Sequence, residues 1–150
     1  MSGEEDLIRL YSKRILALAA DMPFTDRLTE PHGTAKQRSP LCGSTVAVDI
    51  ALAEGRISAF GQEVRACALG QAAASAVGRG IIGRDAAEIA AARDELHAML
   101  KSEGPAPNAP FEELEALLPA RDYKNRHASI MLTLDAVIAA FQDAEGRASA

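Results

Sequence analysis

The spacing of hydrophobic residues divides the chain into helices and strands. Apolar residues recur at helical spacing between positions 4 and 20 and predict a first helix there: Leu7, Ile8, Tyr11, Ile15 and Leu18. A segment rich in Pro, Gly and polar residues follows at 21–40. We expect this segment to be exposed and flexible, with at most one weak edge strand over 34–38.

Strict alternation of apolar and polar residues marks the centre of the chain. Residues 45–52 place four aliphatic side chains on one face, which predicts a half-buried strand: Val46, Val48, Ile50 and Leu52. The stretch "AEG" at 53–55 predicts a turn with Gly55 available for positive φ, and 56–64 returns as a less regular strand. The two strands predict an antiparallel hairpin, in which Asp49 is expected to face solvent.

Four helices are predicted in the rest of the chain. Small residues over 66–82 suit a helix, and Asp85 with Glu88 has capping-box spacing before a helix over 86–101. After a loop at 102–110, Pro110 suits the first position of a short helix, "FEELEALL", that ends at Pro119. A final helix carries apolar residues on one face out to about Asp143: Ile130, Leu134, Val137, Ile138 and Phe141.

This order of elements predicts one domain over residues 1–150 with an α+β fold. The expected architecture is a small antiparallel sheet of about three strands, with helices packed mainly on one face. Residues 144–150 are expected to be a frayed tail.

Composition and charge limit the classes of partner and the cellular compartment that we expect for this protein. The formal net charge is −5 and Lys and Arg form no cluster in the sequence, which argues against nucleic acid and against an anionic membrane surface. No apolar run reaches the roughly 18 residues of a membrane span, and the acidic N-terminus is unlike a secretory signal. We therefore expect a cytoplasmic protein, in which the two cysteines are kept reduced.

The hairpin gives the two cysteines a geometric relation. Cys42 lies twelve residues before Glu54, and Cys67 lies thirteen residues after it. Because equal offsets from the turn return to the same end of an antiparallel hairpin, both thiols are expected at the open end of the sheet. Cys67 is predicted in the first turn of a helix, where the helix dipole favours a thiolate. The spacing leaves open a pair of small buried residues, a disulfide or a metal site, and it names no metal.

Four motifs in order give the chain a family resemblance: "SPLCGS", "AEGRI" at the turn, "ACALGQAAAS" and the late "RHASIMLTLDAV". Over roughly residues 7–141 the chain resembles the U-type iron–sulfur cluster assembly scaffold family, which includes IscU, SufU and the N-terminal domain of NifU. The family version of the first motif reads Asn-Pro-x-Cys-Gly-Asp, of which this chain keeps Pro40, Cys42 and Gly43.

The resemblance implies a ligand set that this chain carries only in part. In the family, three cysteines and an aspartate or histidine hold a nascent [2Fe–2S] cluster, or a zinc ion in some members, at one end of the sheet. Carried over, Cys42 and Cys67 match the first two cysteines, whereas the third falls on Ser129 and the aspartate on Ser44.

A histidine is available close to the missing third cysteine. The histidine that can precede that cysteine in the family falls on Ala128, and His127 is its neighbour. Histidine can replace cysteine at iron–sulfur clusters, so His127 is the expected substitute ligand. Arg126 is expected to fix a cluster sulfide or a partner, and Gly43, Ser44 and Ser129 are expected to line the site.

The resemblance implies a non-enzymatic scaffold or carrier. Such a protein would bind iron and sulfide transiently, receive sulfur from a cysteine desulfurase and pass the cluster to iron–sulfur acceptor proteins. Two alternatives stay open: a zinc-bound, SufU-like sulfur acceptor, and a degenerate module that keeps the fold without metal. A homodimer is also left open.

Overall fold

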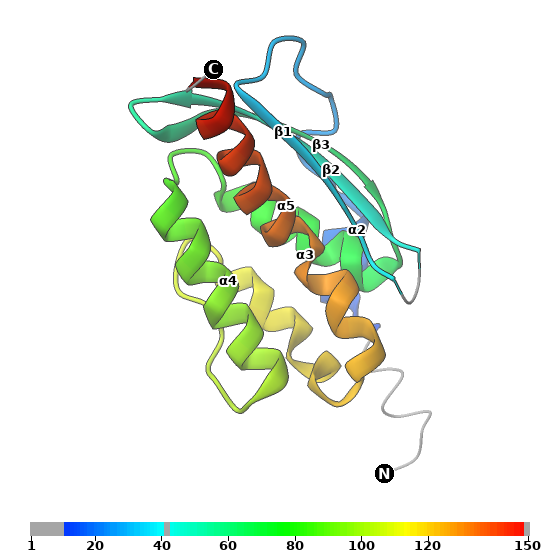
Figure 1. Cartoon of the computed structure of the whole chain (residues 1–150). Coiled ribbons are helices and arrows are strands. Elements are labelled where there is room, and N and C mark those ends of the chain that lie inside the picture. The colour runs from blue at the N-terminus through cyan, green and yellow to red at the C-terminus, as the bar shows by residue number, and fades with distance from the viewer. Residues whose placement is uncertain (1–10, 41–42, 149–150) are drawn as a thin grey trace.

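The structure is a computed structural model, and it describes residues 11–40 and 43–148. Its elements follow in the order α2 (Lys13–Ala20), β1 (Gly33–Arg38), β2 (Thr45–Ala53), β3 (Arg56–Arg65), α3 (Ala68–Gly80), α4 (Ala86–Lys101), the 3₁₀ helix η1 (Glu112–Asp122) and α5 (Lys124–Ala148). The predicted α+β fold is confirmed, with the helices layered against one face of a three-stranded sheet (Figure 1). Residues 4–10 of the predicted first helix lie outside the described residues, in which no helix is long and apolar enough to cross a membrane.

The sheet is an antiparallel meander in the order β1-β2-β3. Glu54 and Gly55 form the two-residue turn between β2 and β3, and both have positive φ, 54° and 77°. This geometry matches the twist of the flanking strands. A register shift at Ala51/Leu52 adds one residue to β3, and at the open end Thr45 lies opposite Arg65. The predicted hairpin is therefore confirmed, and residues 44 and 66 leave it at the same end.

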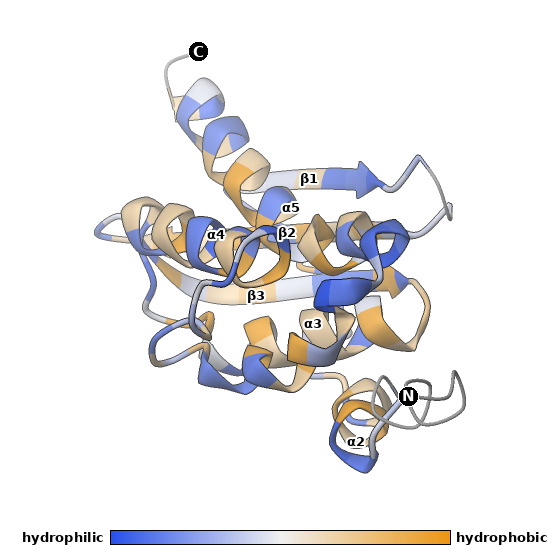
Figure 2. Ribbon diagram, turned by 90° about the horizontal axis from the view of Figure 1, so that it is seen from below, coloured by the Kyte–Doolittle hydropathy of each residue, from blue (hydrophilic) through white to orange (hydrophobic). Residues whose placement is uncertain are grey.

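The helical layer packs at two depths. Helices α3 and α5 contact the sheet, whereas α2 packs on α3 and α4 packs on α5. Gly33 lets α5 approach β1 closely, because a Cβ at this position would collide with the carbonyl oxygen of Ala140. The end of β1 is hydrophilic (Figure 2) and carries Lys36, Gln37 and Arg38. Charged side chains on such an edge oppose pairing with another strand.

The outer face of the sheet is covered by residues 22–32, which we call the strap. A Cβ at Gly61 would lie 2.5 Å from the carbonyl oxygen of Asp26, so the absence of a side chain lets the strap cross the strand. The strap also covers the free edge of β3, since the N–H of Gln62 donates to the Phe24 carbonyl at 2.8 Å. Residues 22–32 thus make defined contacts, while the flexibility of 21–40 stays a prediction.

Asp49 holds the strap in place, and the prediction that it faces solvent is wrong. Its side chain is 3% exposed, and its carboxylate accepts hydrogen bonds from Arg27 Nε at 2.6 Å and Arg27 Nη2 at 2.9 Å. Thr34 Oγ1 donates at 2.7 Å and the Leu28 N–H at 3.0 Å. Burial by itself would raise the pKa of Asp49, but these donors and the Arg27 charge together lower it below its usual value.

Three helix boundaries bear on the sequence predictions. The capping box of Asp85 and Glu88 is confirmed, with reciprocal bonds of 2.8 and 3.2 Å. The short helix predicted to stop at Pro119 instead contains it. It begins at Glu112, after a cis peptide bond between Ala109 and Pro110, and takes the 3₁₀ form. Helix α5 continues to Ala148, beyond the predicted end near Asp143.

Candidate functional site

Three side chains from three elements meet at the open end of the sheet, and we call this cluster the Cys67 corner: Ser44, Cys67 and Ser129. Ser129, on α5, donates its hydroxyl hydrogen to Ser44 Oγ at 3.2 Å. The Cys67 sulfur lies 3.7 Å from Ser129 Oγ. Either the Cys67 S–H or the Ser129 hydroxyl can be the donor in this contact. Ser44 and Ser129 are 5% and 1% exposed, whereas Cys67 is half-buried and a free thiol.

Local structure explains how Cys67 comes to face α5. Cys67 is the N-cap of α3, one position before its predicted place in the first turn, and its side chain makes no capping bond. The thiol contacts Ser129 on α5 and does not cap its own helix. Gly70, one turn later, lets α5 come close, because a Cβ there would lie 2.6 Å from Ser129 Oγ. A larger residue would force Ser129 and Cys67 apart.

The connection from β1 to β2 brings Ser44 into the corner. The Ser39 N–H donates to the Ser44 carbonyl at 2.8 Å, and the Gly43 N–H donates to the Ser39 carbonyl at 3.1 Å. Gly43 has φ of +70°, a conformation that favours glycine. Leu41 and Cys42 lie outside the described residues, so the predicted convergence of Cys42 with Cys67 stays a prediction.

The Cys67 corner can supply one soft ligand and two neutral hydroxyls. A Cys67 thiolate would bind a soft metal ion, and the Ser129 hydroxyl can rotate to donate a hydrogen bond to that sulfur or to a bound sulfide. Hydrogen bonds to sulfur tune the properties of iron–sulfur clusters. Within residues 11–40 and 43–148, no three side chains of His, Cys, Asp or Glu gather as a metal site. The described side chains therefore form no closed four-ligand zinc site.

His127 points to a different side of α5. Residues two apart on a helix lie about 200° apart around its axis, so His127 and Ser129 face opposite ways. His127 is 1% exposed, and its Nε2–H is shared between the carbonyls of Ala120 at 2.8 Å and Arg121 at 3.1 Å. The structure thus brings Cys67, Ser44 and Ser129 together and does not bring His127 to them.

The ring of His127 is held as a neutral imidazole. Burial lowers its pKa, and the positive charges of Lys101 and Lys124 lower it further, although the two carbonyl acceptors act in the opposite direction. With the hydrogen on Nε2, the lone pair lies on Nδ1, which is buried and has no hydrogen-bond partner among the described residues. The Nδ1 lone pair of His127 could bind a metal ion, but the ring lies on a different side of α5 from the Cys67 corner.

Arg126 lies nearer to the face of α5 that carries Ser129. It is half-buried and lies three positions before Ser129, so the two side chains are neighbours on the helix. It makes no ion pair with a described residue, and its backbone N–H donates to the Tyr123 carbonyl at 2.9 Å. A positive charge in this position can attract an anionic cargo or partner.

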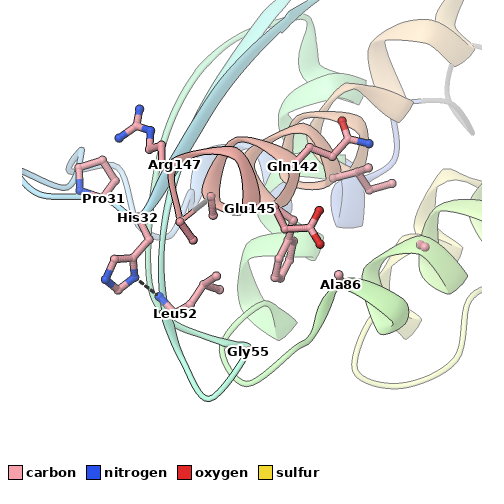
Figure 3. A pocket seen from close by; sticks show the side chains of 13 residues that line it. Pro31, His32, Leu52, Gly55, Ala86, Gln142, Glu145 and Arg147 are labelled. Atoms are coloured by element: carbon pink, nitrogen blue, oxygen red, sulfur yellow. Dashed lines mark hydrogen bonds between the residues drawn. The ribbon is translucent and has the colours of Figure 1, made fainter. Parts of the chain in front are cut away.

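A hollow of about 830 Å³ lies at the other end of the sheet and takes no part in the Cys67 corner. It is bounded by the β2–β3 turn, the start of α4 and the last turns of α5, with Gln142, Glu145 and Arg147 on the helix side (Figure 3). On the opposite side, the Leu52 N–H donates to Nδ1 of His32 at 2.6 Å (Figure 3). Most of the lining is apolar, and sequence reasoning missed this hollow, because its walls come from segments as far apart in the sequence as Pro31 and Ala148.

Comparison with known proteins identifies the family. No protein-family model matches the chain, and no curated protein matches it. Among solved structures, a nitrogen-fixing NifU-like protein (N-terminal) from Brucella abortus is similar with 44% identity and a TM-score of 0.91, over 95% of this chain and 99% of that one. A putative iron–sulfur cluster assembly scaffold protein for the SUF system from Fervidobacterium islandicum shares the fold, with 18% identity, a TM-score of 0.79 and coverage of 89% and 98%. A hypothetical protein also shares the fold, with 18% identity, a TM-score of 0.73 and coverage of 90% and 98%. The chain therefore belongs to the family of NifU-like N-terminal domains, the U-type scaffold family that its motifs resemble.

Proposed function

We propose that this protein is an iron–sulfur cluster assembly scaffold or carrier that holds iron and sulfide as cargo through Cys42 and Cys67 and passes the cluster to acceptor proteins. The observation that carries the proposal is the meeting of Cys67, Ser44 and Ser129 at one end of the sheet in a NifU-like fold. A structural neighbour is described as a putative scaffold for iron–sulfur cluster assembly, which supports the same class of function here. The partners would be a cysteine desulfurase and acceptor proteins, in the cytoplasm.

The ligands at the Cys67 corner suit an iron–sulfur cluster that must be transferred to an acceptor protein. Thiolates are strong ligands for iron, whereas a neutral serine hydroxyl is a poor one, so two thiolates and two hydroxyls hold iron less firmly than four thiolates. Ser44 and Ser129 would then act mainly as hydrogen-bond donors to sulfur, with Gly43 and Arg126 at the edge of the site. An iron site with incomplete protein ligation can exchange its cargo with an acceptor.

His127 enters this proposal as a further ligand on chemical grounds. Its Nε2–H is donated to backbone carbonyls, an arrangement that is typical of metal-binding histidines because it fixes the tautomer and leaves the other nitrogen free. Because its ring lies on another side of α5 from Ser129, its contribution needs a test separate from that of the cysteines.

The test is anaerobic reconstitution of the protein with ferrous iron and sulfide, followed by visible absorption and by iron and acid-labile sulfide analysis. The wild type is expected to develop charge-transfer absorption, and Cys42→Ala and Cys67→Ala are each expected to abolish it. His127→Ala is expected to weaken it, whereas His32→Ala, at the other end of the sheet, is the control and is expected to leave it unchanged. A wild type that develops no absorption would overturn the proposal in favour of a metal-free module. Stoichiometric zinc in protein purified without chelator would instead favour a sulfur acceptor.

A further inference from the structure

A second hollow, of about 400 Å³, lies between the end of β1, helix α4 and the start of α5. The C-terminal end of α4 and the N-terminal end of α5 lie at the same end of the helical layer, in the lower part of Figure 1. Four cationic side chains line this space, which we call the basic hollow: Arg38, Arg93, Lys101 and Lys124. The single carboxylate among its described lining residues belongs to Asp135.

The charges of the basic hollow are not balanced within the described part of the chain. Arg93 Nε is paired with Asp135 at 2.9 Å. Arg38, Lys101 and Lys124 are exposed, and none of them forms an ion pair with a described residue. Three unpaired cations therefore converge from three elements on a protein whose net charge is −5. The sequence concealed this cluster, because its members are separated by up to 86 positions and form no run of basic residues.

The basic hollow adjoins the proposed cluster site. Its lining includes Ser39 and Pro40, at the start of the connection that brings Ser44 to the Cys67 corner. Its lining also includes Ala128, the residue before Ser129. Anything held in the basic hollow would therefore sit beside the place where the proposed function puts the cargo.

We propose that the basic hollow is a docking site for an acidic segment of a partner protein, which it holds next to the Cys67 corner. The purpose of the docking rests on the proposed function, whereas the binding of an acidic segment does not depend on it. Cations contributed by β1, α4 and α5 around one hollow match several carboxylates spread along a peptide. Complementary charge of this kind raises the rate of encounter and sets the orientation of the partner. Nucleic acid is disfavoured because the cations form a closed cluster on an acidic protein and not an extended basic stripe.

The test uses a synthetic hexaglutamate peptide as the probe and the cluster-free, full-length protein. Titration followed by ¹H–¹⁵N NMR is expected to shift the backbone amides of Arg38, Lys101 and Lys124 and to give a dissociation constant that weakens as salt rises. The variant Lys101→Glu/Lys124→Glu is expected to weaken binding about tenfold or more, since two exposed pairs are lost and replaced by repulsion. The matched control is Lys13→Glu/Arg14→Glu, which makes the same change in net charge on α2, where both residues are exposed. It is expected to change the dissociation constant less than about twofold.

Each other outcome would overturn the proposal. Equal weakening by the control variant would show that only net charge matters. Sodium sulfate that shifts the same amides and displaces the peptide at matched ionic strength would identify a site for small anions instead of a protein segment. Shifts confined to other surfaces would place the acidic segment elsewhere. If Lys101→Glu/Lys124→Glu fails to fold by circular dichroism, Lys101→Gln/Lys124→Gln takes its place. Because no iron is present, failure here is distinguishable from failure of cluster reconstitution, which the cysteine variants test.

Discussion

Replacing Asp49 with asparagine tests whether the strap is held to the sheet by a buried charge. The side chain of Asp49 is 3% exposed and accepts four hydrogen bonds, of which two come from Arg27. The asparagine side chain would keep the size and one oxygen, but it would lose the charge and present an NH₂ group where the carboxylate accepted hydrogen bonds. We expect the strap to loosen while the rest of the fold persists.

The expected cost follows from the number and type of these bonds. A hydrogen bond to a charged group contributes about 1.5 to 3 kcal/mol, and asparagine retains part of the network, so we expect a loss of about 2 kcal/mol in the free energy of unfolding. Breaking a fully buried ion pair would cost more, but the side chain of Arg27 is 41% exposed and water can solvate it. For a chain of this length the loss corresponds to a decrease of roughly 4 to 8 °C in Tm.

The pH dependence has a definite sign. The pKa of Asp49 is lower in the folded protein than its usual value, because its hydrogen-bond donors and the Arg27 charge outweigh the effect of burial. Its contribution to stability is therefore present above the unfolded value of about 3.9 and is lost as pH falls through the lower folded pKa. The difference between wild type and Asp49→Asn should be largest near neutral pH and should shrink below about pH 4.

Urea unfolding at pH 7 and at pH 3 would measure this difference, and hydrogen exchange of the Gln62 amide would report on the strap, since this amide donates to Phe24. Asp21→Asn is the control, because Asp21 is paired with Arg79 but its side chain is 86% exposed. That variant should change stability by less than about 0.5 kcal/mol. An Asp49→Asn protein with unchanged stability and unchanged protection of Gln62 would refute the reasoning.

Three further predictions concern the corner and the helical layer. Ser129→Cys would place a second thiol beside Cys67 and should slow the loss of a reconstituted cluster to a chelator by about tenfold or more, measured by the decay of visible absorption; loss at the wild-type rate would contradict the assigned position of Ser129. Gly70→Ala should cost about 1 to 3 kcal/mol in urea unfolding, because its Cβ would lie 2.6 Å from Ser129 Oγ, whereas Gly146→Ala, with nothing within 4 Å, should raise stability by about 0.5 to 1 kcal/mol; equal effects would count against the collision. Arg121→Ala should cost about 2 kcal/mol, because Arg121 donates to the carbonyls of Met99 at 2.7 Å and Gly104 at 3.0 Å; no change in thermal unfolding would show that water replaces both bonds.

Local patterns predicted the elements of this fold well. The alternation over 45–52, the turn at Gly55 and the capping box at Asp85 depend on residues close in sequence, and the structure confirms all three. The hairpin arithmetic predicted Cys42 and Cys67 at one end of the sheet. Thr45 and Arg65 are paired at that end, because the added residue in β3 shifts the register by only one position, while the place of Cys42 itself stays a prediction.

The failures came from contacts between distant segments. Asp49 reads as a solvent-facing residue of an alternating strand, and only the strap, anchored by Arg27 some 22 residues earlier, accounts for its burial. His127 and Ser129 are close in sequence, yet the 3.6-residue period of α5 places them on different sides of the helix. On its side, the His127 ring is held by the carbonyl of Ala120, a contact that the sequence pattern does not show. Pro119 reads as a helix stop, but the segment takes the 3₁₀ form and continues to Asp122.

The close approach of α5 to Gly33 on β1 fixes the position of the whole helix, including its distant residue Ser129. Asp143 accepts the Thr34 N–H at 2.9 Å, and Ala140 and Ala144 lie against Gly33, so the far end of α5 is fixed along its axis and about it. Ser129 lies fourteen residues before Asp143 on the same helix, which is about 21 Å at 1.5 Å per residue. The position of the Ser129 hydroxyl is thus set in part by a backbone contact at the opposite end of α5. A methyl group added at Gly33 would move Ser129 relative to Cys67 without touching either residue.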